Sequence, residues 1–77
     1  MYYVTMTDSF MSGWGMAKGK VNKFVVACGN YSQAEEIAEK AHKRDEMKYI
    51  RIARNMPYYS PSRYLTSYRE YREIHWK

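Results

Sequence analysis

The sequence predicts an α+β domain in which a single helix covers one face of a small antiparallel sheet of three to four strands. Segments rich in aromatic and β-branched residues, which favour strands, occur before and after one segment with helical periodicity. Glycines and prolines mark the boundaries between these segments. The predicted order is strand, strand, helix, strand, strand, and the 77 residues are expected to form one domain, 1–77, with a thin core.

The first two strands are predicted at residues 2–7 and 21–28. The first reads YYVTMT, and the second contains the apolar run FVVAC, which suits a central position in a sheet. Between them, residues 8–20 carry three glycines among polar residues, which predicts a loop longer than the roughly two to five residues of a usual hairpin link. A loop of this length is typical either of a functional segment or of a loosely ordered one.

The helix is predicted to begin at Ser32, because Ser-Gln-Ala-Glu at 32–35 matches a capping box. Small apolar residues then recur at spacings of three and four, namely Ala34, Ile37, Ala38 and Ala41. This spacing predicts a narrow stripe that can lie close against a sheet. Glutamate–lysine pairs four residues apart occupy another part of the helix surface, which we interpret as a solvated face.

The remaining elements follow the helix. Residues 47–54 alternate, with two isoleucines on one side, and predict a third strand with one face in water. Two prolines within 55–62 predict a turn-rich connection, and residues 63–68 predict a fourth strand. The tripeptide repeat at 68–73 predicts a short terminal helical turn. The sheet face opposite the helix, which carries tyrosine and arginine, is expected to stay open as a contact surface.

Charge is distributed unevenly along the chain. The formal net charge is +5, and all of this excess comes from residues 47–77, which hold seven basic and two acidic residues. The same stretch carries six tyrosines and one tryptophan. A basic, aromatic segment favours an anionic partner, either nucleic acid or an acidic protein surface, whereas a positive charge that serves solubility alone is the plainer alternative.

Enzymatic function classes are disfavoured. The glycines at 13 and 15 begin a dinucleotide-type pattern, but Lys18 stands where the third glycine is required. Three residues of metal-binding type, Cys28, His42 and His75, lie far apart in the sequence. Cys28 is also expected to be a buried, reduced thiol, because it ends the apolar run of the second strand. The sequence therefore predicts no catalysis, no metal and no cofactor.

The expected location is the cytoplasm. No apolar run approaches the roughly 20 residues that cross a bilayer, and the first residues lack the pattern of a secretory signal. We therefore expect no membrane partner.

The loop F-M-S-G-W-G at 10–15, together with the first strand, the helix and Met-Lys-Tyr-Ile at 47–50, resembles small uncharacterised proteins encoded by phages and mobile elements. In size and layout the chain is also similar to phage anti-CRISPR proteins, which bind the CRISPR effector complex of the host. This resemblance implies an inhibitor that acts by stoichiometric protein binding in a bacterial cytoplasm. Inhibitors that dock in the DNA channel are often acidic DNA mimics, so this basic chain would instead capture an acidic or mixed patch, or the RNA or DNA of the complex.

Trp14 is the most conspicuous residue of the loop, because a glycine stands on either side of it. It is expected to be either a core residue or an anchor for a partner. The candidate binding residues are Trp14, Lys18, Lys20, Tyr49, Arg51, Arg63, Arg69 and Arg72. The partner is expected to be a host protein or ribonucleoprotein complex; the alternatives are a small basic nucleic-acid-binding protein and a homodimer that covers its open sheet face.

Overall fold

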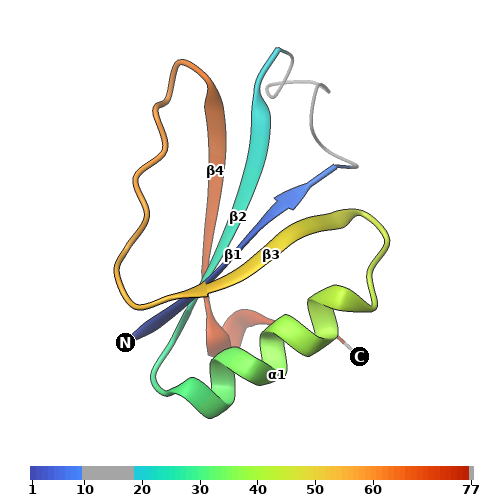
Figure 1. The fold of residues 1–77 in the computed structure, drawn as a ribbon, viewed down its shortest axis with the longest axis vertical. Coiled ribbons are helices and arrows are strands. Elements are labelled where there is room, and N and C mark those ends of the chain that lie inside the picture. The colour runs from blue at the N-terminus through green and yellow to red at the C-terminus, as the bar shows by residue number, and fades with distance from the viewer. Residues whose placement is uncertain (10–18, 77) are drawn as a thin grey trace.

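The computed structural model describes residues 1–9 and 19–76 of the chain. Its elements are β1 (Tyr2–Asp8), β2 (Val21–Cys28), α1 (Tyr31–His42), β3 (Met47–Ala53), β4 (Tyr64–Glu70) and the 3₁₀ turn η2 (Tyr71–Glu73). The strands form one sheet in the order β3-β1-β2-β4, and α1 packs on one of its faces (Figure 1). The predicted α+β class and the predicted order of elements are confirmed.

The sheet is mixed, which corrects the expectation of a wholly antiparallel one. β1 lies between β2 and β3 and is antiparallel to both, so β2 and β3 run parallel to each other. The chain crosses from β2 through α1 to β3, and β1 fills the position between these two strands. β4 joins the outer edge of β2 in the parallel direction. Because β3 and β4 consequently point the same way, residues 54–63 must return along the sheet before β4 can begin. In Figure 1 this connection runs on the side of the sheet away from α1.

The core lies between α1 and the sheet. It contains Val4, Met6, Val26, Cys28, Ala34, Ile37, Ala41 and Met47, all of them buried. The predicted stripe on the helix is confirmed, since Ala34, Ile37 and Ala41 are its buried residues and Ala38 packs beside them. Two of these three buried residues are alanines, which lets the helix backbone approach the sheet closely.

The start of α1 differs from the prediction by two residues. Asn30, rather than Ser32, is the N-cap, and its side-chain oxygen accepts a hydrogen bond from the backbone N–H of Gln33 at 2.8 Å. The Gln33 side chain in turn accepts from the backbone N–H of Gly29 at 2.9 Å. The earlier start also brings the ring of Tyr31 against that of Tyr2, with 5.4 Å between centroids. These contacts explain why the helix begins before the sequence pattern at Ser32.

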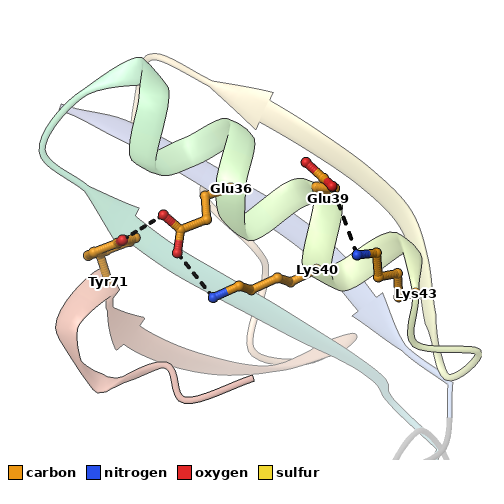
Figure 2. A network of polar contacts seen from close by, with 5 residues as sticks. All are labelled: Glu36, Glu39, Lys40, Lys43 and Tyr71. Atoms are coloured by element: carbon orange, nitrogen blue, oxygen red, sulfur yellow. Dashed lines mark hydrogen bonds and ion pairs between the residues drawn. The ribbon is translucent and has the colours of Figure 1, made fainter. Parts of the chain in front are cut away.

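The C-terminal segment returns to the helix side of the sheet. The predicted terminal turn forms at Tyr71–Glu73, while residues 68–70 extend β4. The hydroxyl of Tyr71 donates to Glu36 of α1 at 2.8 Å (Figure 2). Further on, the ring of Trp76 packs on that of Phe24 with 5.6 Å between centroids. The end of the chain therefore borders the core.

Candidate functional site

Three of the four ion pairs of the described residues lie on or just after α1, and the fourth lies at the end of β4. They are Glu36–Lys40 at 3.1 Å, Glu39–Lys43 at 3.9 Å, Glu46–Arg44 at 2.9 Å and Glu70–Arg72 at 2.9 Å. The first two lie along α1 and its C-cap (Figure 2), the third lies in the turn that follows, and the fourth joins the end of β4 to the C-terminal turn. Basic residues of the strands β2 and β3 take part in none of these pairs.

Strand register places all three basic residues of β2 and β3 on the face opposite α1. Thr7 of β1 is paired with Lys23 of β2 and with Lys48 of β3, and Thr5 is paired with Arg51. Residues directly opposite each other in a sheet point to the same side. Met6 and Val4, which alternate with these threonines, face the helix. Lys23, Lys48 and Arg51 therefore share the far face.

β4 adds tyrosines to the same face. Its parallel register pairs Tyr64, Thr66 and Tyr68 with Val21, Lys23 and Val25 of β2. We call this surface the basic sheet face and define it by Lys23, Lys48, Arg51, Tyr3, Tyr59, Tyr64 and Tyr68. Glu70 is the acidic residue that the register places there; it lies at the end of β4 and is paired with Arg72.

Lys23 lies at the centre of the basic sheet face and contacts residues of β1, β4 and the connection 54–63. Its ammonium group donates to the Thr7 hydroxyl at 2.8 Å and lies 5.4 Å from the ring centre of Tyr59 and 5.9 Å from that of Tyr64. The two rings are 5.3 Å apart. Burial, followed by the nearby charge of Arg51, lowers the pKa of Lys23. The hydroxyl and the two rings therefore hold the ammonium group in place, and the charge of Arg51 lies near enough to act on it.

The expectation of a fully open sheet face is wrong at its centre. Thr5, Thr7, Val25 and Ala27 all point to this side, yet all are buried, and Val25 is only 1% exposed. The connection 54–63 brings Tyr59 over the strands, so that tyrosine rings cover the backbone. What reaches water are the long side chains at the rim, including Lys48, Arg51 and Tyr68.

Tyr49 stands at the edge of this face in an irregular part of β3. The β1–β3 register shifts between Thr5 and Thr7, so that three steps along β3, from Lys48 to Arg51, match two along β1. Tyr49 lies within this β-bulge with a φ of 55°, in the left-handed region. Its side chain is 77% exposed. The alternation of 47–54 gave no indication of this irregularity.

The predicted binding residues are divided among several places. Arg51 lies on the basic sheet face and Tyr49 at its edge. Lys20 and Arg63 immediately precede β2 and β4 at one end of the sheet, where the N–H of Val21 donates to the carbonyl of Arg63 at 3.0 Å.

The other predicted residues lie elsewhere. Arg69 belongs to the opposite face of β4, since it is paired with Val26, and Arg72 is held by Glu70. Trp14 and Lys18 lie outside the described residues.

The candidate residues chosen from the sequence omitted two cations of this surface, Lys23 and Lys48, and its four tyrosines. Lys23 and Lys48 share a face only through their common partner Thr7, and Tyr59 reaches Lys23 only through the path of the connection. The one available signal was the period of two that places Lys23 on the side of Val25.

A groove of about 510 Å³ lies on the helix side, lined by Asp8, Phe24, Arg44, Glu46, Met47 and Trp76. The guanidinium of Arg44 lies 5.1 Å from the Trp76 ring centre and pairs with Glu46 at 2.9 Å, so its charge already has partners within the fold.

Reactive and metal-binding side chains are dispersed. Cys28 is fully buried, and burial, followed by the charge of Glu36, raises the pKa of its thiol. Across residues 1–9 and 19–76, no three residues of the His, Cys, Asp and Glu types gather closely enough to hold a metal ion. The helices in the same part of the chain are too short or too polar to cross a membrane.

Comparisons with known protein families, with curated proteins and with solved structures found no match for this chain.

Proposed function

We propose that this protein is a small, non-enzymatic nucleic-acid-binding protein that holds the phosphate backbone of its ligand on the basic sheet face. The observation that carries the proposal is the grouping of charge: Lys23, Lys48 and Arg51 lie together on the sheet face opposite α1, outside the ion pairs of the described residues, and Glu70, the carboxylate of that face, lies at the end of β4 and is paired with Arg72. Cations grouped without carboxylates attract polyanions.

The aromatic residues support nucleic acid over a simple acidic surface. Tyr68 is partly exposed beside the cations, and Tyr59 and Tyr64 hold Lys23 between the sheet and the connection. Sites that bind nucleic acid strands combine a positive surface for phosphates with aromatic rings for bases. The basic sheet face contains both components on one rigid support.

A matched pair of charge reversals tests this proposal. Arg51→Glu and Lys43→Glu change the net charge equally, but Arg51 belongs to the basic sheet face and Lys43 to the solvated surface of α1. We expect Arg51→Glu to weaken oligonucleotide binding and to reduce the slope of log K against log salt by about 0.7, the contribution of one phosphate of a single strand. Lys43→Glu should leave the slope unchanged. Equal losses in both variants would show that net charge alone drives binding and would refute the site.

A second candidate is a stoichiometric inhibitor of a host protein complex, such as a CRISPR effector. It is supported by two exposed side chains of the connection 54–63, Met56 and Tyr58, because Met and Tyr are enriched in protein interfaces. Tagged protein incubated with bacterial lysate, with and without nuclease, should then retain a discrete protein complex in both cases, and equimolar protein should block target binding by that purified complex. Recovery of nucleic acid alone, lost on nuclease treatment, would refute the inhibitor. Either partner would be met in a bacterial cytoplasm, a reducing compartment compatible with the free thiol of Cys28.

A homodimer across the same face is less favourable. Two-fold symmetry places the same patch on both sides of the interface, so the cations Lys23, Lys48 and Arg51 would face a second copy of the same cationic patch. Like charges placed opposite one another in an interface destabilise it by roughly several kcal/mol. Light scattering at low salt should therefore report a monomer, and a stable dimer would contradict this reasoning.

A further inference from the structure

Tyr49 has an unusual backbone conformation and an unusual exposure at once. Among residues 1–9 and 19–76 it is the one non-glycine residue with a positive φ, at 55°. A bulky L-residue is strained there, because its Cβ crowds the neighbouring carbonyl oxygen. The ring is 77% exposed, so burial within the protein does not offset this strain.

No interaction within the described part of the chain explains the tyrosine. Its ring takes part in none of the ring or cation–π contacts there, and its hydroxyl in none of the hydrogen bonds. A bulge that served only to protect the β3 edge would form more easily with glycine or asparagine at this position. Strained residues of this kind, held by a well-ordered sheet, occur preferentially at functional sites.

The neighbours of Tyr49 are two cations of the basic sheet face. Lys48 and Arg51 are paired with Thr7 and Thr5, two residues apart on β1, so their attachment points are about 7 Å apart along the sheet. Neither takes part in an ion pair of the described residues. The bulge thus inserts an outward-pointing aromatic residue between two exposed cations.

We propose that Tyr49 is a stacking platform for an unpaired base, and that the ligand of the basic sheet face is a single-stranded nucleic acid whose phosphates on either side of that base contact Lys48 and Arg51. The inference rests on the proposed function, because it assigns the form of the nucleic acid and the residue that recognises it. In a duplex, neighbouring bases cover one another, which leaves no base face for the ring of Tyr49. A single strand offers both an exposed base and a backbone that can follow the strand edge.

Three substitutions at Tyr49 separate stacking from other roles. Tyr49→Phe keeps the ring, and Tyr49→Leu keeps apolar bulk without the aromatic face. Tyr49→Gly removes the side chain and with it the strain of the positive φ. Binding of a short fluorescein-labelled oligothymidylate, followed by anisotropy, should be unchanged in Tyr49→Phe. The other two should bind about five- to hundredfold more weakly, the range that one stacked base supports. Their salt slopes should match that of the wild type, because the phosphate contacts remain.

Matched controls distinguish stacking from loss of structure. Tyr58 is also highly exposed but lies in the connection 54–63, so Tyr58→Leu should bind the oligonucleotide like the wild type. Tyr49→Gly should melt at the same temperature as the wild type or higher, since glycine tolerates the left-handed region. A glycine variant that binds weakly while remaining fully folded supports the platform.

Different results would refute the stacking platform and the proposed nucleic-acid-binding function. If Arg51→Glu weakens binding but all three Tyr49 variants bind like the wild type, the stacking platform is refuted and the proposed function stands. A duplex of the same length bound as tightly as the single strand would likewise overturn the single-strand assignment. If the wild-type protein binds neither form at low salt, the proposed function is refuted, and this inference with it.

Discussion

Replacing Ile37 with alanine should remove much of the stability of this fold. Ile37 is 1% exposed and is the one large side chain among the buried residues of α1, the others being Ala34 and Ala41. The substitution deletes three carbons at about 0.8 kcal/mol each, or about 2.4 kcal/mol of burial energy. The cavity left beside the alanines brings the expected loss to about 3 kcal/mol.

This loss is large for a chain of 77 residues, whose total stability is expected to be about 4–12 kcal/mol. It corresponds to a fall of about 12–24 °C in melting temperature. Urea denaturation followed by circular dichroism measures the free energy of unfolding directly. Ile37→Val serves as the control and should lose about 1 kcal/mol. A loss below about 1 kcal/mol for Ile37→Ala, with an unchanged urea slope, would refute the packing of α1 on the sheet through this residue.

Three further predictions concern the frame that supports the basic sheet face. Asn30→Ala should destabilise the protein by about 1 kcal/mol while Ser32→Ala has little effect, as thermal melts would show, because Asn30 is the observed cap. The Tyr71 hydrogen bond, followed by that of Lys40, lowers the pKa of Glu36 below its ordinary value of 4.5. A lowered carboxyl pKa stabilises the fold above pH 4.5 and loses that contribution as the pH falls through the folded pKa, so unfolding free energies measured against pH should fall less steeply on the acid side in Tyr71→Phe. Cys28 should react with a thiol reagent only after urea unfolding; rapid labelling of the native protein would contradict its burial.

Local patterns in the sequence were sufficient to predict most of the elements. The aromatic and β-branched runs, the small-residue stripe of α1 and the prolines after β3 each depend on residues close together in the chain, and each element was found near its expected bounds. The direction of β4 could not be predicted in this way. Tyr64, Thr66 and Tyr68 alternate identically in a parallel and an antiparallel strand, and the edge that β4 joins depends on the path of residues 54–63.

The site was less predictable than the fold, because it is assembled across strands. Arg51 and Tyr49 were expected to bind, but Lys23 and Lys48 become neighbours of the same surface only through the register of β1. The positive φ of Tyr49 arises from a register shift between Thr5 and Thr7, which no alternation in 47–54 indicates. Arg72, in contrast, was expected to be part of a binding rim but pairs with Glu70.

The most direct test of the central claim is a salt titration of oligonucleotide binding by the wild-type protein. Three cations define the basic sheet face, and each phosphate neutralised on a single strand contributes about 0.7 to the slope of log K against log salt. We expect binding at low salt, with log K falling linearly with log salt at a slope of about −2. Absence of binding at low salt, or an affinity that does not change with salt, would contradict the assignment of the basic sheet face as a nucleic-acid site.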